Sequence, residues 1–408
     1  MNKRKIINDP VFGFINIPDE FIFGIINHPY VQRLNRIKQL ELTFYVYPGA
    51  MHSRFHHSLG AMHLMSEAIN QLRSNGHPIS DEEKSGAMAC ILMHDIGHGP
   101  FSHALENTLV NSISHEEISL LLMNRMNREI DGKLDLAIAI FMDTYPKKFL
   151  HQLVSGQLDV DRLDYLRRDS FFTGVTEGNI GSARILKMLN LKDDKLVIEA
   201  KGIYSIENFL MARRLMYWQV YLHKTAVAAE NMLINTLRRA KYLASQGMGL
   251  NVTPALHFFL YNQVDKTTFK NNPEALDFFT ELDDNDIWCA LKDWEKSTDK
   301  VLSLLSRGLV NRNLFKIEIS EIAPSPEILI EMTVNYAKTY GLSTEDASYL
   351  LSADAITTNM YRDEDDSIDI LYKDGTIHDI STASDMLNIQ LLSKKIKKYY
   401  ICFLRDSK

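Results

Sequence analysis

Cysteine is scarce in this sequence: the 408 residues include three, Cys90, Cys289 and Cys402, which lie far apart along the chain. Their spacing excludes the paired cysteines of a zinc ribbon, a redox motif or a disulfide framework. A chain of this length buries a sizeable core without such cross-links. We therefore expect three reduced, packed thiols and a cytoplasmic protein.

Long apolar runs and an excess of positive charge are missing too. No stretch of about 18 uninterrupted apolar residues occurs, so no membrane-spanning helix is expected, and residues 1–10 lack the apolar core of a signal peptide. The formal net charge of −7 argues against general nucleic-acid binding, which needs a basic face, although a local basic pocket for phosphates stays compatible with it. Histidine, in contrast, is concentrated between residues 52 and 115.

Hydrophobic periodicity predicts a mainly helical protein with a short N-terminal β-hairpin and an α+β C-terminal region. The hairpin is expected within residues 1–16, where apolar pairs flank the turn residues of the segment Asn8-Asp9-Pro10. Helices are expected at residues 19–28, 57–72, 80–94, 114–126, 159–169 and 205–245, and strands at 195–199, 314–319, 368–372 and 399–403. The first clear break after the long helix covers residues 246–249, so we divide the chain into residues 1–246 and 247–408.

The densest chemical motif is residues 94–103, HDIGHGPFSH. His94 and Asp95 end an apolar run, so a buried helix delivers an imidazole and a carboxylate together. Two glycines and a proline follow, which forces a tight turn and brings backbone close to whatever is bound. His98 and His103 lie on or just after this turn. The structural alternative is a set of histidines that cap helices and bind backbone carbonyls.

Three further segments carry groups of the same kind. Arg54 precedes His57 at the beginning of an amphipathic helix, and His115 has a carboxylate neighbour, Glu116. The segment around Arg213 on the long helix combines cations and aromatic residues, which suits a polyphosphate and a sugar or base. Ordinary packing with extended cationic side chains explains that last pattern equally well.

Residues 159–169 are expected to form one short helix with a functional face. Asp161, Tyr165 and Asp169 are spaced i, i+4 and i+8, so two carboxylates and a phenol share that face, and Arg162 lies beside it. The alternative for this segment is a solvated charged helix with salt bridges.

Together, His57, His94-Asp95 and Asp161 match the H…HD…D pattern of the HD superfamily. The surrounding sequence is similar to that of the deoxynucleoside triphosphate (dNTP) triphosphohydrolases, the vertebrate enzymes with a SAM and an HD domain and their bacterial relatives. The similarity covers roughly residues 5–225 and rests on residues 45–50, 54–60, 94–103, 159–161 and 221–224. It implies an HD-domain helical fold, with residues 1–246 as the phosphohydrolase catalytic domain and residues 247–408 in oligomerisation or regulation.

The resemblance also implies a reaction and a cofactor. Two imidazoles and two carboxylates, from His57, His94, Asp95 and Asp161, suit a first-row divalent metal ion or magnesium (iron, manganese, zinc or magnesium), with room for a second magnesium ion brought by the nucleotide. Water would attack the α-phosphorus of a dNTP, releasing deoxynucleoside and triphosphate. A homo-oligomer is expected as well, because related enzymes assemble symmetrically.

Roles for the remaining residues follow from the same resemblance. His98 and His115 would contact the α-phosphate, with His115 as the general acid that Glu116 orients. Asp95 is expected among the catalytic residues as well as among the metal ligands. The residues expected to bind substrate are Arg54 for the α-phosphate, Arg162, Tyr165 and Arg213 for the rest of the triphosphate, Gln39 and Asp169 for the 3′-hydroxyl, Leu40 and Tyr221 for excluding a 2′-hydroxyl, and His103.

The sequence departs from the family pattern at several positions. Arginine replaces lysine at Arg162, Leu222 replaces a glutamine beside the sugar-facing tyrosine, and residues 41–44 replace a glycine-rich stretch. At the expected allosteric nucleotide site, Lys5, Asn8 and Gln32 fit, but Asn27 and Asn35 replace the charged residues that read a guanine. The alternatives are therefore an HD-domain nucleotidase or phosphodiesterase acting on other nucleotides, and a nucleotide sensor without catalysis.

Overall fold

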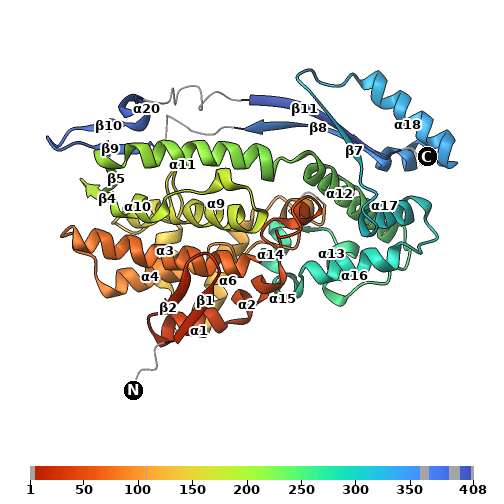
Figure 1. Cartoon of the computed structure of the whole chain (residues 1–408). Helices are drawn as coiled ribbons and strands as arrows, with labels where there is room; N and C mark the ends of the chain where they lie inside the picture. The colour runs from red at the N-terminus through yellow and green to blue at the C-terminus, as the bar shows by residue number, and fades with distance from the viewer. Residues whose placement is uncertain (1–4, 107, 359–366, 386–395, 406–408) are drawn as a thin grey trace.

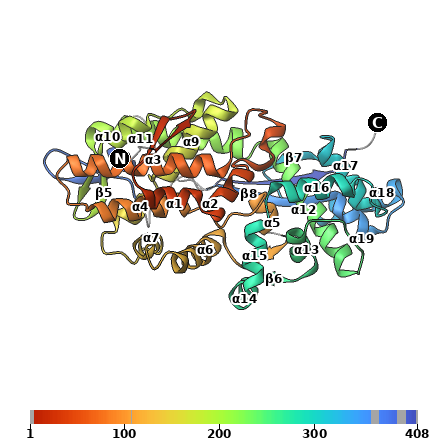
Figure 2. The same ribbon diagram turned by 90° about the horizontal axis from the view of Figure 1, so that it is seen from below.

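The computed structural model describes residues 5–106, 108–358, 367–385 and 396–405. The side chain of His103 lies outside the described part, so its predicted role in substrate binding stays a prediction. Figure 1 shows a mainly helical molecule with a small hairpin near its N-terminus and strands of the C-terminal region along one side, which confirms the predicted fold class. Seen from below, α1, α3, α4 and α7 lie at one end, and α12, α16, α17 and α18 lie at the other (Figure 2).

The N-terminal hairpin forms as the sequence predicts. β1 (Lys5–Asp9) pairs antiparallel with β2 (Gly13–Ile17), with Ile7 opposite Ile15. The carboxylate of Asp9 accepts hydrogen bonds from the backbone amides of Val11 and Phe12, which closes the turn. α1 (Glu20–Asn27) follows with Asp19 as its N-cap, and α2 (Pro29–Arg33) comes directly afterwards.

Three helices build the centre of the molecule. α3 (Arg54–Ser74) packs between α4 (Asp81–Met93) and α9 (Val160–Thr173), and their apolar faces are fully buried. A capping box at Ser80 begins α4, because the Ser80 side chain accepts from the Glu83 amide while the Glu83 carboxylate accepts from the Ser80 amide. α6 (His115–Glu129) begins with an equivalent box.

The prediction of a single long helix at residues 205–245 is wrong. The structure has α11 (Ile203–Met216), a π-helical turn at Tyr217–Tyr221, and then α12 (Lys224–Ser245). Between them, His223 takes an extended backbone and its ring accepts a hydrogen bond from the Thr225 amide, so it caps α12. Because a histidine is not a typical helix breaker, the sequence carries no signal for this interruption. The expected end of the helix before Gln246 is confirmed.

Strands of the C-terminal region pair partly with the N-terminal half. β4 (Leu189–Lys192) and β5 (Lys195–Glu199) form the expected local pair, and β9 (Asp369–Leu371) adds in parallel to β5, followed by β10 (Ile377–Asp379). A second sheet has β11 (Ile396–Phe403) between β7 (Lys316–Ser320) and β8 (Leu351–Thr358). The strands expected at 314–319, 368–372 and 399–403 fall in β7, β9 and β11, whereas β8 was not expected. The division of the chain at residue 246 stays a prediction.

Short connections and further helices complete the molecule. A parallel bridge joins β3 (Val110–Asn111) to β6 (Val264–Asp265). No helix in the described ranges is both long enough and apolar enough to cross a membrane. The remaining α-helices are α5 (Ser102–Glu106), α7 (Asp135–Phe141), α8 (Phe149–Gln152), α10 (Ser182–Lys187), α13 (Pro254–Tyr261), α14 (Lys266–Asn271), α15 (Pro273–Glu281), α16 (Asp284–Trp294), α17 (Lys300–Val310), α18 (Pro326–Tyr340), α19 (Thr344–Ala347) and α20 (Ile380–Ala383).

Candidate metal centre and substrate pocket

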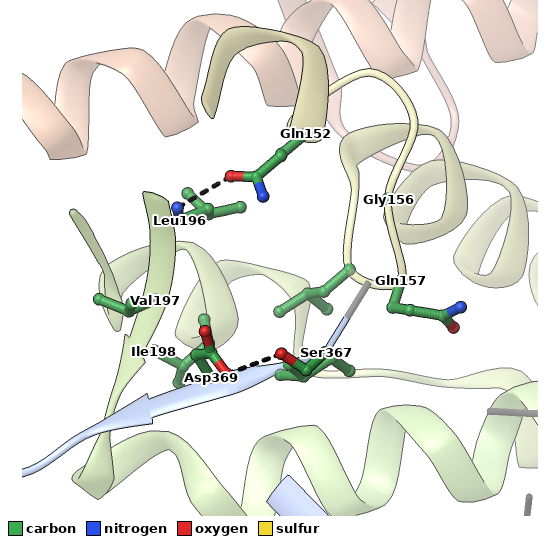
Figure 3. Close-up of a pocket in the computed structure, with 10 residues that line it drawn as sticks. Gln152, Gly156, Gln157, Leu196, Val197, Ile198, Ser367 and Asp369 are labelled. Carbon is green, nitrogen blue, oxygen red and sulfur yellow. Dashed lines mark hydrogen bonds between the residues drawn. The ribbon is translucent and has the colours of Figure 1, made fainter. Parts of the chain in front are cut away.

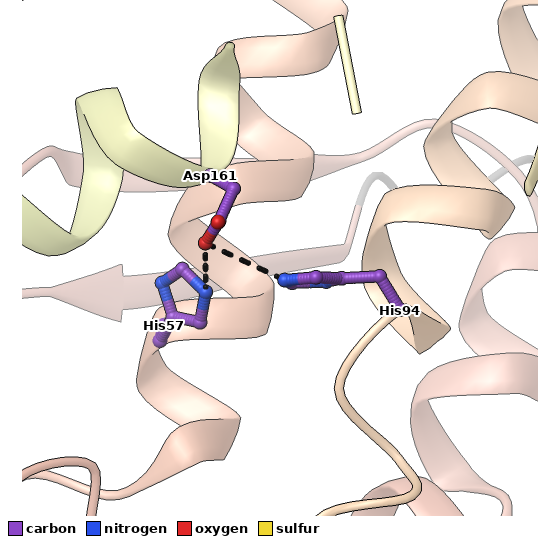
Figure 4. Close-up of side chains that lie close together, drawn as sticks. All are labelled: His57, His94 and Asp161. Atoms are coloured by element: carbon purple, nitrogen blue, oxygen red, sulfur yellow. Dashed lines mark ion pairs between the residues drawn. The ribbon is translucent and has the colours of Figure 1, made fainter. Parts of the chain in front are cut away.

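Three of the four predicted metal ligands meet at one point, although they come from three different helices. His57 lies in the first turn of α3, His94 ends α4, and Asp161 lies in the first turn of α9. Asp161 Oδ1 is 2.9 Å from His57 Nε2 and 3.5 Å from His94 Nε2. Figure 4 shows both imidazoles pointing toward the Asp161 carboxylate. Their ligand atoms are mutually close enough to share one ion.

The hydrogen bonds of the two imidazoles prepare them as ligands. His57 Nδ1 bonds to Asp164 Oδ2 at 2.7 Å, and His94 Nδ1 bonds to the carbonyl oxygen of Ile91 at 2.6 Å. Both partners are acceptors, so each Nδ1 carries the proton and each Nε2 is left to bind a cation. The two Nε2 atoms are buried and lack a well-oriented hydrogen bond to any described residue. Two orphaned nitrogens facing a carboxylate fit a divalent metal ion.

Asp95, the fourth predicted ligand, lies at the edge of this cluster. Its Oδ1 is 3.3 Å from His94 Nε2, and its Oδ2 is 3.9 Å from His57 Nε2. The same carboxylate receives a 2.8 Å hydrogen bond from Arg54 and lies 3.3 Å from His98 Nε2. The structure therefore places Asp95 between the metal ligands and the residues expected to contact the α-phosphate.

The protonation states of the side chains in this cluster depend on one another. Burial by itself would lower the pKa of His57, but the contacts with Asp161 and Asp164 outweigh it and raise the pKa to about 10. The pKa of Asp161 is lowered, because the two imidazoles outweigh the opposing effect of burial. In the protein without a bound cation, the protonated imidazoles thus offset the negative charge of the Asp161 carboxylate. A cation that binds here displaces those protons.

His98 and His115 stack at a ring-centroid distance of 3.9 Å, but their protonation differs. Burial, followed by the positive charge of Arg54, lowers the pKa of His98 to about 3. Burial also opposes a charge on His115, yet the contact with Glu106 and the charge of Glu116 outweigh it and raise its pKa. His98 is therefore neutral near pH 7, whereas His115 more readily holds a proton.

His115 lies between two carboxylates. Glu116 Oε1 is 3.3 Å from Nε2, as the sequence led us to expect, and Glu106 Oε1 is 3.3 Å from Nδ1. The side chain of Glu116 is 61% exposed and that of Glu106 only 30%, so Glu106 is the less screened partner. Glu106 was not among the predicted site residues.

A cavity of about 480 Å³ opens beside the centre. Gln39 Oε1 is buried there without a hydrogen-bond partner among the described residues. Asp169 is held by Tyr221, whose hydroxyl donates at 2.8 Å, and by His52 Nε2 at 2.7 Å. The pocket is lined by Gln39, Leu40, Glu41, Leu42, Thr43, Arg54, Tyr165, Asp169, Tyr217, Tyr221, Leu222, Ala226 and Glu230.

Two of the predicted phosphate-binding arginines are directed to protein groups. Arg162 forms an ion pair with Asp159 and donates to the Gly156 carbonyl. Arg213 donates to Gln157 Oε1 at 3.0 Å. Both guanidinium groups are close enough to Tyr165 to counter the rise that burial causes in its pKa. They therefore lie near the pocket, but they are held by the loop before α9.

That loop borders a second, much smaller pocket of about 30 Å³, shown in Figure 3. It lies between Gly156, Gln157, the strand β5 and the beginning of β9. Its volume has room for about two water molecules, so it does not fit a nucleotide.

Two side chains of the expected activator site, those of Lys5 and Gln32, form contacts with nearby residues of the chain. Lys5 pairs with Glu20 at 2.9 Å, and Gln32 donates to the Ile26 carbonyl while accepting from Asn35. Allosteric nucleotide binding stays a prediction.

Sequence reasoning missed three residues that support the site: Asp164, His52 and Glu106. Asp164 follows Asp161 by three positions in a charged run, where a structural salt bridge is the ordinary explanation. His52 belongs to the histidine-rich segment, but only the fold brings its ring against Asp169 and stacks it on Phe172. For Glu106 the sequence offers no separate signal.

Comparison with known proteins gives consistent relatives. The HD domain family matches residues 54–169, and the HD associated region matches residues 180–247. The uncharacterized protein YwfO of Bacillus subtilis is 32% identical over 400 residues, which cover 94% of this chain and 88% of YwfO. Human deoxynucleoside triphosphate triphosphohydrolase SAMHD1 is 26% identical over 378 residues, 81% of this chain and 57% of the human protein. The crystal structure of a phosphohydrolase from Bacteroides thetaiotaomicron is 65% identical, with a TM-score of 0.97 over 99% of this chain and 100% of that chain.

Proposed function

Because the chain belongs to the HD-domain family of dNTPase-like phosphohydrolases, we propose that it is a metal-dependent dNTP triphosphohydrolase. It would hydrolyse a dNTP to deoxynucleoside and triphosphate. The observation that carries this proposal is the convergence of two buried imidazole nitrogens on the Asp161 carboxylate, directly beside a cavity of about 480 Å³. A cation there would polarise a phosphoryl oxygen and activate water.

His57, His94 and Asp161 would hold the cation in this proposal, and Asp95 would complete the set. Water attacks the α-phosphorus, and the bond from phosphorus to the 5′-oxygen of the sugar breaks. The leaving oxygen needs a proton, which His115 supplies as general acid. The raised pKa of His115 supports this role, and Glu106 and Glu116 maintain its charge. Arg54, which donates to Asp95 and lines the cavity, would neutralise the reacting phosphate.

Selection of a deoxyribose follows from the walls of the cavity. Gln39 Oε1 has no hydrogen-bond partner among the described residues, so it is available to accept from a 3′-hydroxyl. Asp169, which also lines the cavity, is fixed by His52 and Tyr221. The side chain of Leu40 and the ring of Tyr221 leave an apolar boundary where a 2′-hydroxyl would lose its hydrogen bonds to water.

Arg162 and Arg213 bind the β- and γ-phosphates only after exchanging their present partners. The loop before α9 would release their guanidinium groups when a triphosphate enters. Charge-assisted hydrogen bonds to phosphate would replace those to Asp159 and Gln157.

We also propose that the protein is a homo-oligomer that uses α18. Of its 15 residues, all within the described part, Tyr336 is the one that is buried. Ile328 and Ile330 on this helix and Ile322 before it are 48%, 63% and 79% exposed. Large apolar side chains that are this exposed on one helix favour an interface.

One assay tests the proposed reaction. The purified protein is incubated with manganese or magnesium and each of the common dNTPs and ribonucleoside triphosphates, and the products are separated by chromatography. Deoxynucleoside together with triphosphate is the expected result. Nucleoside monophosphate products would instead identify a nucleotidase or phosphodiesterase, and tight binding without turnover would identify a sensor.

A further inference from the structure

A chain of buried charged groups connects the metal centre to the N-terminal hairpin. His57 Nδ1 bonds to Asp164 at 2.7 Å. Arg168 grips the same carboxylate with two parallel hydrogen bonds, Nε to Oδ2 at 2.9 Å and a terminal nitrogen to Oδ1 at 3.0 Å. Its other terminal nitrogen donates to Asp9 Oδ2 at 2.7 Å. Four side chains from α3, α9 and β1 thus form one continuous series.

Water is excluded from this series. The side chains of His57, Asp164 and Arg168 are 0% exposed and that of Asp9 is 3% exposed. Gly60, one turn after His57, provides the space: a Cβ there would lie 1.9 Å from Asp164 Oδ1 and 2.2 Å from Arg168. Because each group is desolvated, its orientation depends on its neighbours in the series.

Asp9 joins the series to the geometry of the hairpin turn. Its Oδ1 accepts from the backbone amides of Val11 and Phe12 at 2.9 and 2.8 Å, while Oδ2 accepts from Arg168. The Phe12 ring lies under the guanidinium of Arg167, 4.7 Å from ring centroid to carbon. A change in the turn would therefore move the Asp9 carboxylate, which is the second carboxylate that Arg168 binds.

We propose that Asp9 is a positioning residue for the metal centre, acting through Arg168 and Asp164 on His57. A carboxylate that accepts the second N–H of a metal-ligating imidazole fixes the direction of the ring and increases its basicity. Here that carboxylate, Asp164, is itself held by two hydrogen bonds from Arg168. Arg168 is in turn bonded to Asp9 of the hairpin. This inference rests on the proposed metal centre, but not on the identity of the substrate.

A purely structural role is the competing explanation. Removing one partner of a buried ion pair strongly destabilises a protein, whatever the pair does. A second buried arginine provides a matched control. Arg239 grips Asp299 with two hydrogen bonds and also reaches Asp346, and Asp299 caps α17 much as Asp9 closes its turn.

The experiment compares manganese affinity, measured by competition with a chelator, in the wild type, Asp9→Asn, Arg168→Lys and Asp299→Asn, each checked for its melting temperature. We expect about tenfold weaker manganese binding in Asp9→Asn and in Arg168→Lys, since loss of such outer contacts weakens a site by about 10–100-fold. Asp299→Asn should melt at a lower temperature and bind manganese like the wild type.

Equal affinity in the wild type and Asp9→Asn would overturn the positioning role while leaving the metal centre intact. Failure of the wild type to bind manganese would overturn the metal centre and this inference with it. If Asp9→Asn does not fold, hydrogen exchange of the wild type decides. Binding at His57 should slow exchange of the Val11 and Phe12 amides, because coupling between two sites is reciprocal. Unchanged exchange at both amides would overturn the inference.

Discussion

Residues 54–169 and residues 250–405 are both rich in helices, but they keep charged side chains in different places. In the first region, Arg54, Asp95, Asp164, Arg168 and Asp169 are buried and bonded to one another or to histidines. In the described part of the second, the buried charged side chains are Asp283 and Asp284.

Even these two carboxylates belong to contacts with the N-terminal half. Asp283 pairs with Arg36, and Asp284 accepts from the Lys38 amide at 3.0 Å. Buried charge stabilises a fold weakly because desolvation opposes it. Most of the buried charge in the first region gathers around one cluster, which indicates chemistry, whereas the described part of the second region has mainly apolar packing and an exposed helix, α18.

The sharpest test of this comparison removes one carboxylate from each region. Asp161→Ala should abolish metal binding and lower the turnover of dNTPs on the order of a thousandfold, about 4 kcal/mol, because it takes away the charge on which both imidazoles converge. Metal content by elemental analysis and turnover by product chromatography measure the two effects.

Asp299→Ala is the counterpart in the second region. It breaks the ion pair with Arg239, so it should lower the melting temperature and leave both metal content and turnover unchanged. A comparable loss of metal in both variants would show that buried charge does not distinguish the two regions.

A smaller effect is expected from the partner of the general acid. His115 must carry a proton to donate one, so turnover should fall as pH rises through its raised pKa. Glu106→Gln removes an attraction for that proton, lowers the pKa of His115, and should move the alkaline limb of the pH–rate profile to lower pH. Initial rates across pH 5–9, about the range where histidine titrates, measure the shift.

Glu129→Gln is the matched control, because Glu129 pairs with His28 at 3.1 Å outside the cavity. Its profile should follow the wild type. An unmoved alkaline limb in Glu106→Gln would remove the basis for a Glu106–His115 pair in proton transfer.

Local signals account for the parts of the fold that the sequence predicts correctly. The capping boxes at Ser80 and Ser114 fix where two helices begin, and the turn residues around Asp9 fix the hairpin. The interruption at His223 and the strand β8 escape prediction for a physical reason. The first depends on a histidine cap without proline or glycine, and the second on pairing with β11, which lies far along the chain.

The candidate site divides in the same way. Spacing within α9 places Asp161, Tyr165 and Asp169 on one face, and the structure directs that face to the centre and the cavity. Asp164 lies on the neighbouring face, where a one-dimensional pattern cannot separate a support for His57 from an ordinary salt bridge. Groups that act through another side chain are therefore the ones the sequence leaves out.

The smallest effect on catalysis is expected at α18, the proposed subunit contact. Ile330→Glu places a charge at an exposed apolar position of this helix, and burying that charge in an interface without a partner is unfavourable. The dissociation constant of the oligomer should rise about tenfold, which is a loss of about 1.4 kcal/mol in association free energy. Metal content should stay unchanged. Light scattering coupled to size-exclusion chromatography over a dilution series measures the mass. Lys338→Glu, a charge reversal at an exposed position of the same helix, is the control that should behave like the wild type. A mass that does not respond to Ile330→Glu would place the subunit contact elsewhere, because a buried glutamate at its centre cannot be silent.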